Sequence, residues 1–100
     1  MAHIDYYFST PSPWAYLAGD RLERIAARHG ATITWKPVAL SDLILKIENN
    51  QPRPERSPGR MAYRDQELAR WAEHLGLPLN LRPRHFPVNG APAAYAIIAA

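Results

Sequence analysis

The chain has 100 residues, of which 47% are hydrophobic and 21% charged, with a net charge of +3 and no cysteine. This length suits one globular domain, and the composition is not that of a disordered chain. No apolar run approaches the roughly 20 residues that a membrane span needs, and the N-terminus lacks the basic-then-apolar pattern of a secretory signal. Since a chain without cysteine fits a reducing compartment, we expect a cytoplasmic protein.

The positive charge is too dispersed to predict nucleic-acid binding. Arginines cluster in the second half of the chain, but acidic residues lie among them and no nucleic-acid-binding module is recognisable. We therefore expect these arginines to form a solvated surface or to meet a small anionic ligand. The clusters are Arg53, Arg56, Arg60 and Arg64, and Arg82 with Arg84.

The first forty residues predict a βαβ unit. Residues 3–9 are apolar apart from Asp5 and predict a central strand, whereas residues 31–38 alternate in polarity and predict a second strand. Residues 12–29 carry apolar side chains at helical spacing and end at Gly30, which suits the end of a helix. A strand, a helix and a strand in this order predict two parallel strands joined by a right-handed crossover.

The remaining residues predict three helices. Ser41 or Asp42 is expected to cap a short helix, and residues 60–75 form a long amphipathic one. Residues 91–100 predict a last, apolar helix that begins after Asn89, a good N-cap residue.

Two proline-containing loops, residues 49–59 and 77–88, separate these helices. The first is either a linker between domains or an ordered loop that reaches over a site. Because two strands make a poor sheet by themselves, we expect the sheet to be completed by residues of a longer protein or, as the alternative, by another chain.

The junction between the first strand and the first helix is the main candidate for a functional site. Pro11 cannot donate to a sheet and ends the strand, Ser12 suits the N-cap, and Pro13 suits the first helical position. A hydroxyl is then held at the positive end of a helix, where a thiolate, phosphate or carboxylate is stabilised. The alternative is that Ser12 only caps the helix.

Several short motifs occur together in this chain. They are Ser12-Pro13-Trp14-Ala15-Tyr16-Leu17, Asn50-Gln51-Pro52, Pro58-Gly59-Arg60, Gly76-Leu77-Pro78 and His85-Phe86-Pro87-Val88-Asn89. In this combination the sequence resembles the family of kappa-class glutathione transferases and 2-hydroxychromene-2-carboxylate isomerases, which have a DsbA-like thioredoxin fold. The resemblance runs through nearly all of the chain but covers only the first half of the family's plan.

The resemblance implies an α/β fold class. Residues 1–40 correspond to the N-terminal βαβ part of a thioredoxin-like domain, and residues 41–100 to part of a helical insertion. The chain is thus truncated relative to the family fold, whose remaining strands and cis-proline loop follow the insertion.

The resemblance also implies a function, which is that of a glutathione-dependent isomerase of the 2-hydroxychromene-2-carboxylate isomerase type. In this reading the Ser12 hydroxyl stabilises the thiolate of bound glutathione, and Asn50 and Arg60 bind the same cofactor. The substrate is a small aromatic-derived molecule, and the protein is a homodimer. The alternatives are a kappa-type glutathione transferase and a non-catalytic thioredoxin-like binding or scaffold fragment. Whether 100 residues alone are active stays open.

Three further residues are candidates for substrate binding, namely Trp14, Lys46 and His85. Each has a plainer interpretation, since Trp14 is suited to a core or interface, and a histidine beside Phe-Pro in a loop usually packs or hydrogen-bonds. Asn50 can equally well turn the chain, and Arg60 can be a surface residue. No metal site is expected, because the four histidines are scattered and no cysteine accompanies them. A serine hydrolase is also unexpected, because no Gly-x-Ser-x-Gly motif is present.

Overall fold

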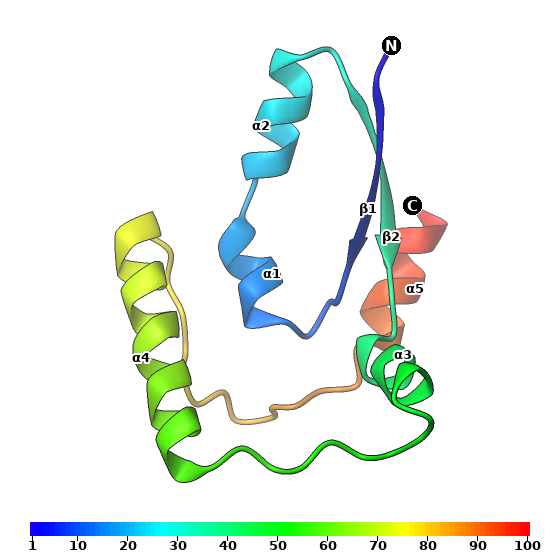
Figure 1. Ribbon diagram of the computed structural model, residues 1–100. Helices are drawn as coiled ribbons and strands as arrows, with labels where there is room; N and C mark the ends of the chain where they lie inside the picture. Colours follow the sequence, from blue (N-terminus) through cyan, green and yellow to red (C-terminus); the bar gives the residue numbers. More distant parts are fainter.

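The computed structural model describes residues 1–100, and its arrangement of strands and helices confirms the predicted α/β class (Figure 1). Figure 1 shows α1 and α2 leading from the end of β1 back to the start of β2, with α5 beside β2 and α4 beyond α1. The elements are β1 (His3–Phe8), α1 (Pro13–Ala18), α2 (Arg21–Arg28), β2 (Thr32–Pro37), α3 (Leu40–Ile47), α4 (Pro58–Leu75) and α5 (Ala91–Ala99).

The two strands form a parallel pair, as predicted. His3 lies opposite Thr32 at one end of the register and Phe8 lies opposite Pro37 at the other. The sheet of the chain has these two strands. The expectation that β1 is a central strand stays a prediction, because further strands are expected from a longer protein. Both carboxyl ends lie at the same edge of the sheet, as in any parallel pair, and the turn that carries Ser12 follows β1 there.

The two faces of the sheet differ in polarity because neighbouring strand residues point to opposite faces. On one face Tyr6 and Phe8 stack with ring centroids 5.3 Å apart, and Trp35 of β2 meets both rings edge-on. On the other face His3, Asp5 and Tyr7 are exposed. The prediction that the strand is apolar apart from Asp5 is therefore wrong, and only one face of the sheet is apolar.

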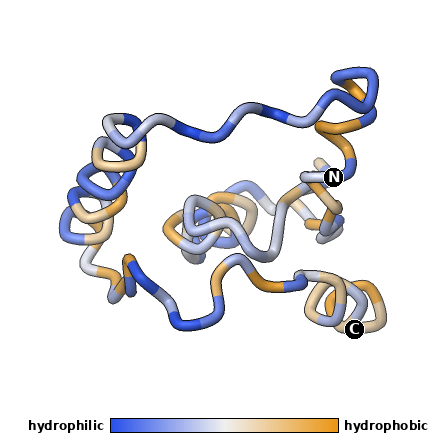
Figure 2. Tube along the Cα trace, turned by 90° about the horizontal axis from the view of Figure 1, so that it is seen from below, coloured by the Kyte–Doolittle hydropathy of each residue, from blue (hydrophilic) through white to orange (hydrophobic).

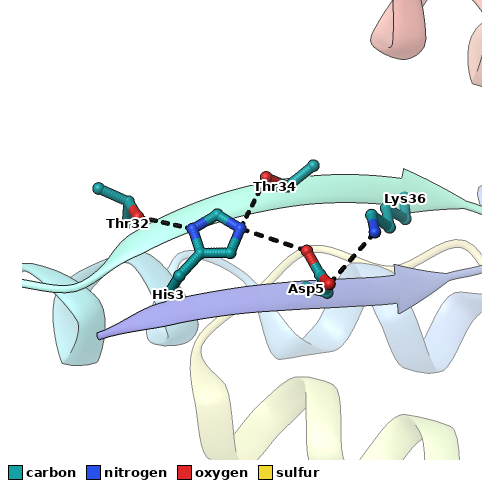
Figure 3. Close-up of polar contacts among 5 residues, drawn as sticks. All are labelled: His3, Asp5, Thr32, Thr34 and Lys36. Atoms are coloured by element: carbon teal, nitrogen blue, oxygen red, sulfur yellow. Dashed lines mark hydrogen bonds and ion pairs between the residues drawn. The ribbon is translucent and has the colours of Figure 1, made fainter. Parts of the chain in front are cut away.

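A connected network of polar side chains occupies the second face (Figure 3). The His3 ring lies between two threonines of β2, with Nδ1 2.6 Å from the Thr32 hydroxyl oxygen and Nε2 2.9 Å from that of Thr34. His3 Nε2 is also 3.2 Å from one oxygen of Asp5, and Lys36 Nζ is 3.2 Å from the other. The network therefore cross-links the two strands. The hydrogen bond from Lys36 lowers the pKa of the Asp5 carboxyl group.

The predicted helix at residues 12–29 is interrupted at Gly19. Gly19 has φ 58° and ψ −139°, a conformation that a residue with a side chain rarely adopts, and it ends α1 after Ala18. The chain resumes as α2 at Arg21. Helical spacing of apolar residues continues across this break, which is why the sequence pattern predicted one helix where there are two.

Three helix boundaries also differ from the prediction. The first residue of α3 is Leu40 and its N-cap is Ala39, which makes no side-chain hydrogen bond, so neither Ser41 nor Asp42 caps it. Only two residues lie between Pro37, the last residue of β2, and the first residue of this helix, so Ser41 and Asp42 already lie in its first turn. The helix α4 begins at Pro58, two residues before the predicted start, because Ser57 accepts a hydrogen bond from the Arg60 amide. The N-cap of α5 is Gly90 and not Asn89, because the Asn89 side chain accepts from the Ala91 amide one position outside the cap.

The small core lies between α1 and α4. Leu17 of α1 and Leu68 of α4 are 4% and 2% exposed, and Ala72 packs with them. Leucines at the end of α4 and in the segment after it pack against this cluster, and the contact fixes α4 against the helix that Ser12 caps. These partly buried leucines are Leu75, Leu77, Leu79 and Leu81.

Outside this contact the chain has an open shape. Only 4 of 100 residues are buried and the accessible surface is 8076 Å², whereas a compact monomer of this mass exposes about 5,700 Å². The radius of gyration is 15.8 Å, compared with about 13 Å for a compact domain of this length. Figure 2 shows mostly apolar residues along α5 and hydrophilic ones along the segment between α3 and α4. No helix is long and apolar enough to cross a membrane.

The polar network predicts an acid-sensitive contribution to stability. Because the pKa of Asp5 is lower in the folded chain than in the unfolded one, its ion pair stabilises the fold above the unfolded value of about 3.9 and loses this effect as the pH falls further. Asp5→Asn should flatten the dependence of the unfolding free energy on pH below about 4. Chemical denaturation at several pH values measures this. Asp42→Asn, which removes an exposed carboxylate without an ion-pair partner, is the matched control. Equal slopes for the two variants would contradict the assignment.

Candidate functional site

A tight turn connects β1 to α1 and holds Ser12. The Ser12 amide donates to the Ser9 carbonyl over 3.2 Å, which closes the turn around Thr10 and Pro11. Pro13 follows as the first residue of α1, as predicted. The proline on each side of Ser12 restricts φ at its own position, so the backbone that presents Ser12 has little freedom.

Ser12 is the N-cap of α1, as predicted. Its backbone is extended, with φ −74° and ψ 122°, and its Oγ accepts a hydrogen bond from the Ala15 amide at 3.2 Å. In this bond the hydroxyl is an acceptor, and its own proton is not used by any group of the chain. A hydroxyl oxygen has two lone pairs and one proton. Ser12 can therefore cap the helix and donate to a ligand at the same time, so the two interpretations do not exclude each other.

Ser12 lines a cleft of about 410 Å³ at the carboxyl ends of the two strands. The walls come from β1 and the turn after it, from the beginning of α1, from Val38, which follows β2, and from α3. None of the lining residues is an acid, a lysine, an arginine or a histidine. They are Tyr6, Tyr7, Phe8, Ser9, Ser12, Ala15, Val38, Leu40 and Leu43.

This lining limits the chemistry that Ser12 can perform. A nucleophilic serine needs an adjacent general base to take its proton, and the cleft offers none. A serine that donates its proton to an anion needs no base. In largely apolar surroundings such a charge-assisted hydrogen bond is stronger than in water. The geometry therefore favours Ser12 as a hydrogen-bond donor to an anion.

The helix itself contributes less than the sequence suggested. With only six residues, α1 aligns few peptide dipoles, and the positive potential at its N-terminus is accordingly small. The Ser12 hydroxyl, and not the helix dipole, is thus the feature of this helix end that can interact with an anion.

Asn50 and Lys46 lie at the end of α3. Asn50 has φ 61° and its amide donates to the Leu45 carbonyl at 2.8 Å, so its backbone turns the chain away from the helix. Its side chain is exposed and makes no hydrogen bond within the chain. Lys46 is in the last turn of α3 and is also exposed. Neither residue lines the cleft that contains Ser12.

The other three candidates are also exposed. Arg60 is in the first turn of α4, with no ion-pair partner, and its backbone amide donates to Ser57. Trp14 is 42% exposed on α1, and His85 lies in the segment between α4 and α5. The structure therefore brings none of the six candidates together in one pocket, and Ser12 alone lines the cleft.

Two features near the turn were missed by the sequence analysis. Arg64 and Phe86 lie with Pro13 around a small hollow on the α4 side of the junction. Arg82 forms an ion pair with Asp65, and this pair joins the segment after α4 to α4 itself. The hydrogen bond from Arg82 lowers the pKa of the Asp65 carboxyl group. Both contacts join residues far apart in the sequence, and no local pattern indicates them.

Comparison with known proteins places the chain in a family. Residues 3–100 match the DSBA-like thioredoxin domain, and the chain belongs to this family. A solved structure of a 2-hydroxychromene-2-carboxylate isomerase superposes on 96% of the chain and on 52% of its own length, with a TM-score of 0.62 and 30% identity. The predicted resemblance is confirmed.

Curated relatives point the same way. A 2-hydroxychromene-2-carboxylate isomerase from Pseudomonas putida is 34% identical over 86 residues, which is 86% of this chain and 40% of the relative. Glutathione S-transferase kappa 1 from Caenorhabditis elegans is 30% identical over 84 residues, which is 83% of this chain and 36% of the relative. The chain thus spans about 40% of the length of the curated relatives it matches.

The backbone at Asn50 allows a test that separates its two interpretations. Asn50→Ala should destabilise the fold by about 1–2 kcal/mol, because a Cβ is disfavoured at positive φ. Asn50→Gly should not, because glycine adopts this conformation readily. Denaturation measures stability, and calorimetry with reduced glutathione measures binding. Weaker binding by a stable Asn50→Gly variant would identify the amide as a ligand group. Unchanged binding would leave Asn50 with its backbone role alone.

Proposed function

We propose that the chain belongs to a glutathione-dependent isomerase of the 2-hydroxychromene-2-carboxylate isomerase type. The observation that carries the proposal is the Ser12 hydroxyl, which lines an uncharged cleft while its proton remains free. The similarity to relatives of that name supports the reaction type, and the similarity to a kappa-class transferase supports the cofactor.

The residues of the cleft fit a thiolate better than other anions. A thiolate is large and weakly hydrated compared with a carboxylate or a phosphate, and apolar walls with hydroxyl groups but no cation suit such a group. A phosphate or a carboxylate would require several donors or a cation, and the lining contains no cation. The chemistry that glutathione supplies when bound is reversible nucleophilic addition to a conjugated carbon, which permits rotation about the former double bond.

In this proposal each chain residue has a limited role. Ser12 donates its proton in a hydrogen bond to sulfur and so favours the ionised thiol. The Ala15 amide holds the oxygen of Ser12 in place. Leu40 and Leu43 of α3 supply apolar surface to the same cleft. Arg60 and Asn50, which lie outside the cleft, are assigned to the polar ends of glutathione, and Lys46, Trp14 and His85 to the substrate.

The proposal extends to the domain organisation and to the whole protein. We propose that residues 1–40 form the N-terminal part of a thioredoxin-like domain and residues 41–100 part of a helical insertion. We further propose a small aromatic-derived substrate, a cytoplasmic location and a homodimeric protein.

A kappa-type glutathione transferase is the second candidate, favoured by the kappa relative. The products distinguish the two. An isomerase returns glutathione unchanged and yields a product of the same composition as the substrate. A transferase consumes glutathione and yields a sulfur conjugate. If titration calorimetry detects no binding of reduced glutathione to the full-length protein, both enzymes are excluded and a scaffold role remains.

Ser12→Ala tests the proposal, with Ser57→Ala as a matched control. Both serines cap a helix whose first residue is proline, and each accepts a bond from the amide three residues later. Both variants should lose about 1 kcal/mol of stability with the cap. Only Ser12→Ala should make the bound thiol less acidic, by about 10- to 100-fold, since a hydrogen bond to a charged group contributes about 1.5–3 kcal/mol.

The ultraviolet absorbance of the thiolate, followed against pH, measures this acidity. Equal acidity in Ser12→Ala and the wild type, or an equal loss in both variants, would show that Ser12 is only a cap.

A further inference from the structure

The N-terminus of α5 lies directly against the turn that carries Ser12. A Cβ atom at Gly90 would be 2.6 Å from the Thr10 Oγ1 and 2.8 and 2.9 Å from the Cγ and Cδ of Pro11. Distances below 3.0 Å do not occur for Cβ atoms in practice. The backbone of Gly90 has φ −78° and ψ −8°, which any residue can adopt. Space, and not backbone conformation, therefore requires glycine at this position.

A hydrogen bond holds the two segments together. The Thr10 hydroxyl donates to the Gly90 carbonyl over 3.1 Å, and both residues are partly buried. On the other side of the glycine, the Asn89 side chain accepts from the Ala91 amide at 3.1 Å and fixes the chain as it enters α5. The contact joins residues 80 positions apart in the sequence.

We propose that Gly90 is a positioning residue for Ser12. Pro11 is bonded directly to Ser12, and its ring cannot rotate away as a flexible side chain would. The turn is also closed by the Ser12 amide on the Ser9 carbonyl. A displacement of Pro11 therefore moves the Ser12 hydroxyl relative to its cleft. Gly90 permits the close approach, and the Thr10 hydrogen bond maintains it.

The expected effect on the acidity of a bound thiol rests on the proposed function. The positioning of Ser12 by Gly90 does not. If Ser12 orients a thiolate, a displaced hydroxyl donates a poorer hydrogen bond, and the bound thiol becomes less acidic. The Ala15 amide reports the position of Ser12 without any ligand, because it donates to the Ser12 Oγ.

Gly90→Ala in the full-length protein tests the proposal, with Gly59→Ala as control. A Cβ at Gly59 meets no atom within 4 Å, so this variant adds the same methyl group without a clash. Gly90→Ala should speed hydrogen exchange of the Ala15 amide and lower kcat by about 10- to 100-fold, as displacements of about 1 Å do. The KM for the substrate should stay the same, and the bound thiol should become less acidic. Gly59→Ala should change none of these.

A second pair of variants acts without added volume. Thr10→Val removes the donor to the Gly90 carbonyl, and Thr10→Ser keeps it. Thr10→Val should reproduce the faster exchange at Ala15, and Thr10→Ser should restore the wild-type rate. If Gly90→Ala does not fold, these two Thr10 variants still test whether the contact with Gly90 positions Ser12.

Two outcomes overturn the proposal. One is a folded Gly90→Ala variant with wild-type exchange at Ala15, and the other is a Thr10→Val variant that matches Thr10→Ser. A failure of the proposed function looks different, since then the wild type itself shows no ionised glutathione while the exchange results at Ala15 still hold.

Discussion

The hydrogen bond from the Ala15 amide to the Ser12 hydroxyl oxygen determines what this turn can do. It uses the oxygen of Ser12 as an acceptor and leaves the proton available for another partner. The proline before Ser12 and the proline after it restrict the backbone, so the hydroxyl is held by its surroundings and not by a ligand. An oriented donor beside apolar walls is a suitable partner for a polarisable anion.

The open shape of the chain explains why the other candidate residues are dispersed. Asn50 and Lys46 are carried by the end of α3 and Arg60 by the start of α4, and the extended segment between these helices keeps the two groups apart (Figure 1). The packing of Leu17 on Leu68 fixes α4 on the far side of α1. Only the part of the site that belongs to the βαβ unit is formed by local structure, and this part contains Ser12.

The sequence predicted what local rules determine. The Ser12 cap and the proline at the start of α1 follow from residues within a few positions of each other. The parallel pairing of the strands follows from the order strand, helix, strand. The same rules also apply at Ser57-Pro58, where the prediction placed a loop, because the prolines around this pair masked its cap. A Ser-Pro pair therefore predicts a helix start, and only the surroundings of the serine can indicate a function.

The sequence did not predict features that depend on distant residues. Gly19 interrupts a helix whose apolar spacing continues, and nothing in that spacing marks the break. The approach of Gly90 to Pro11 and the pairing of Arg82 with Asp65 each join segments far apart in the chain. Local propensities carry no information on such contacts, since these arise only when the helices have packed.

A crystal structure of the full-length protein with reduced glutathione tests the central claim most directly. The account predicts the sulfur atom within hydrogen-bonding distance of the Ser12 Oγ, inside the cleft formed with Leu40 and Leu43, and the Ala15 amide still bonded to that oxygen. A glutathione sulfur bound elsewhere, or a Ser12 hydroxyl turned away from the cleft, would contradict it.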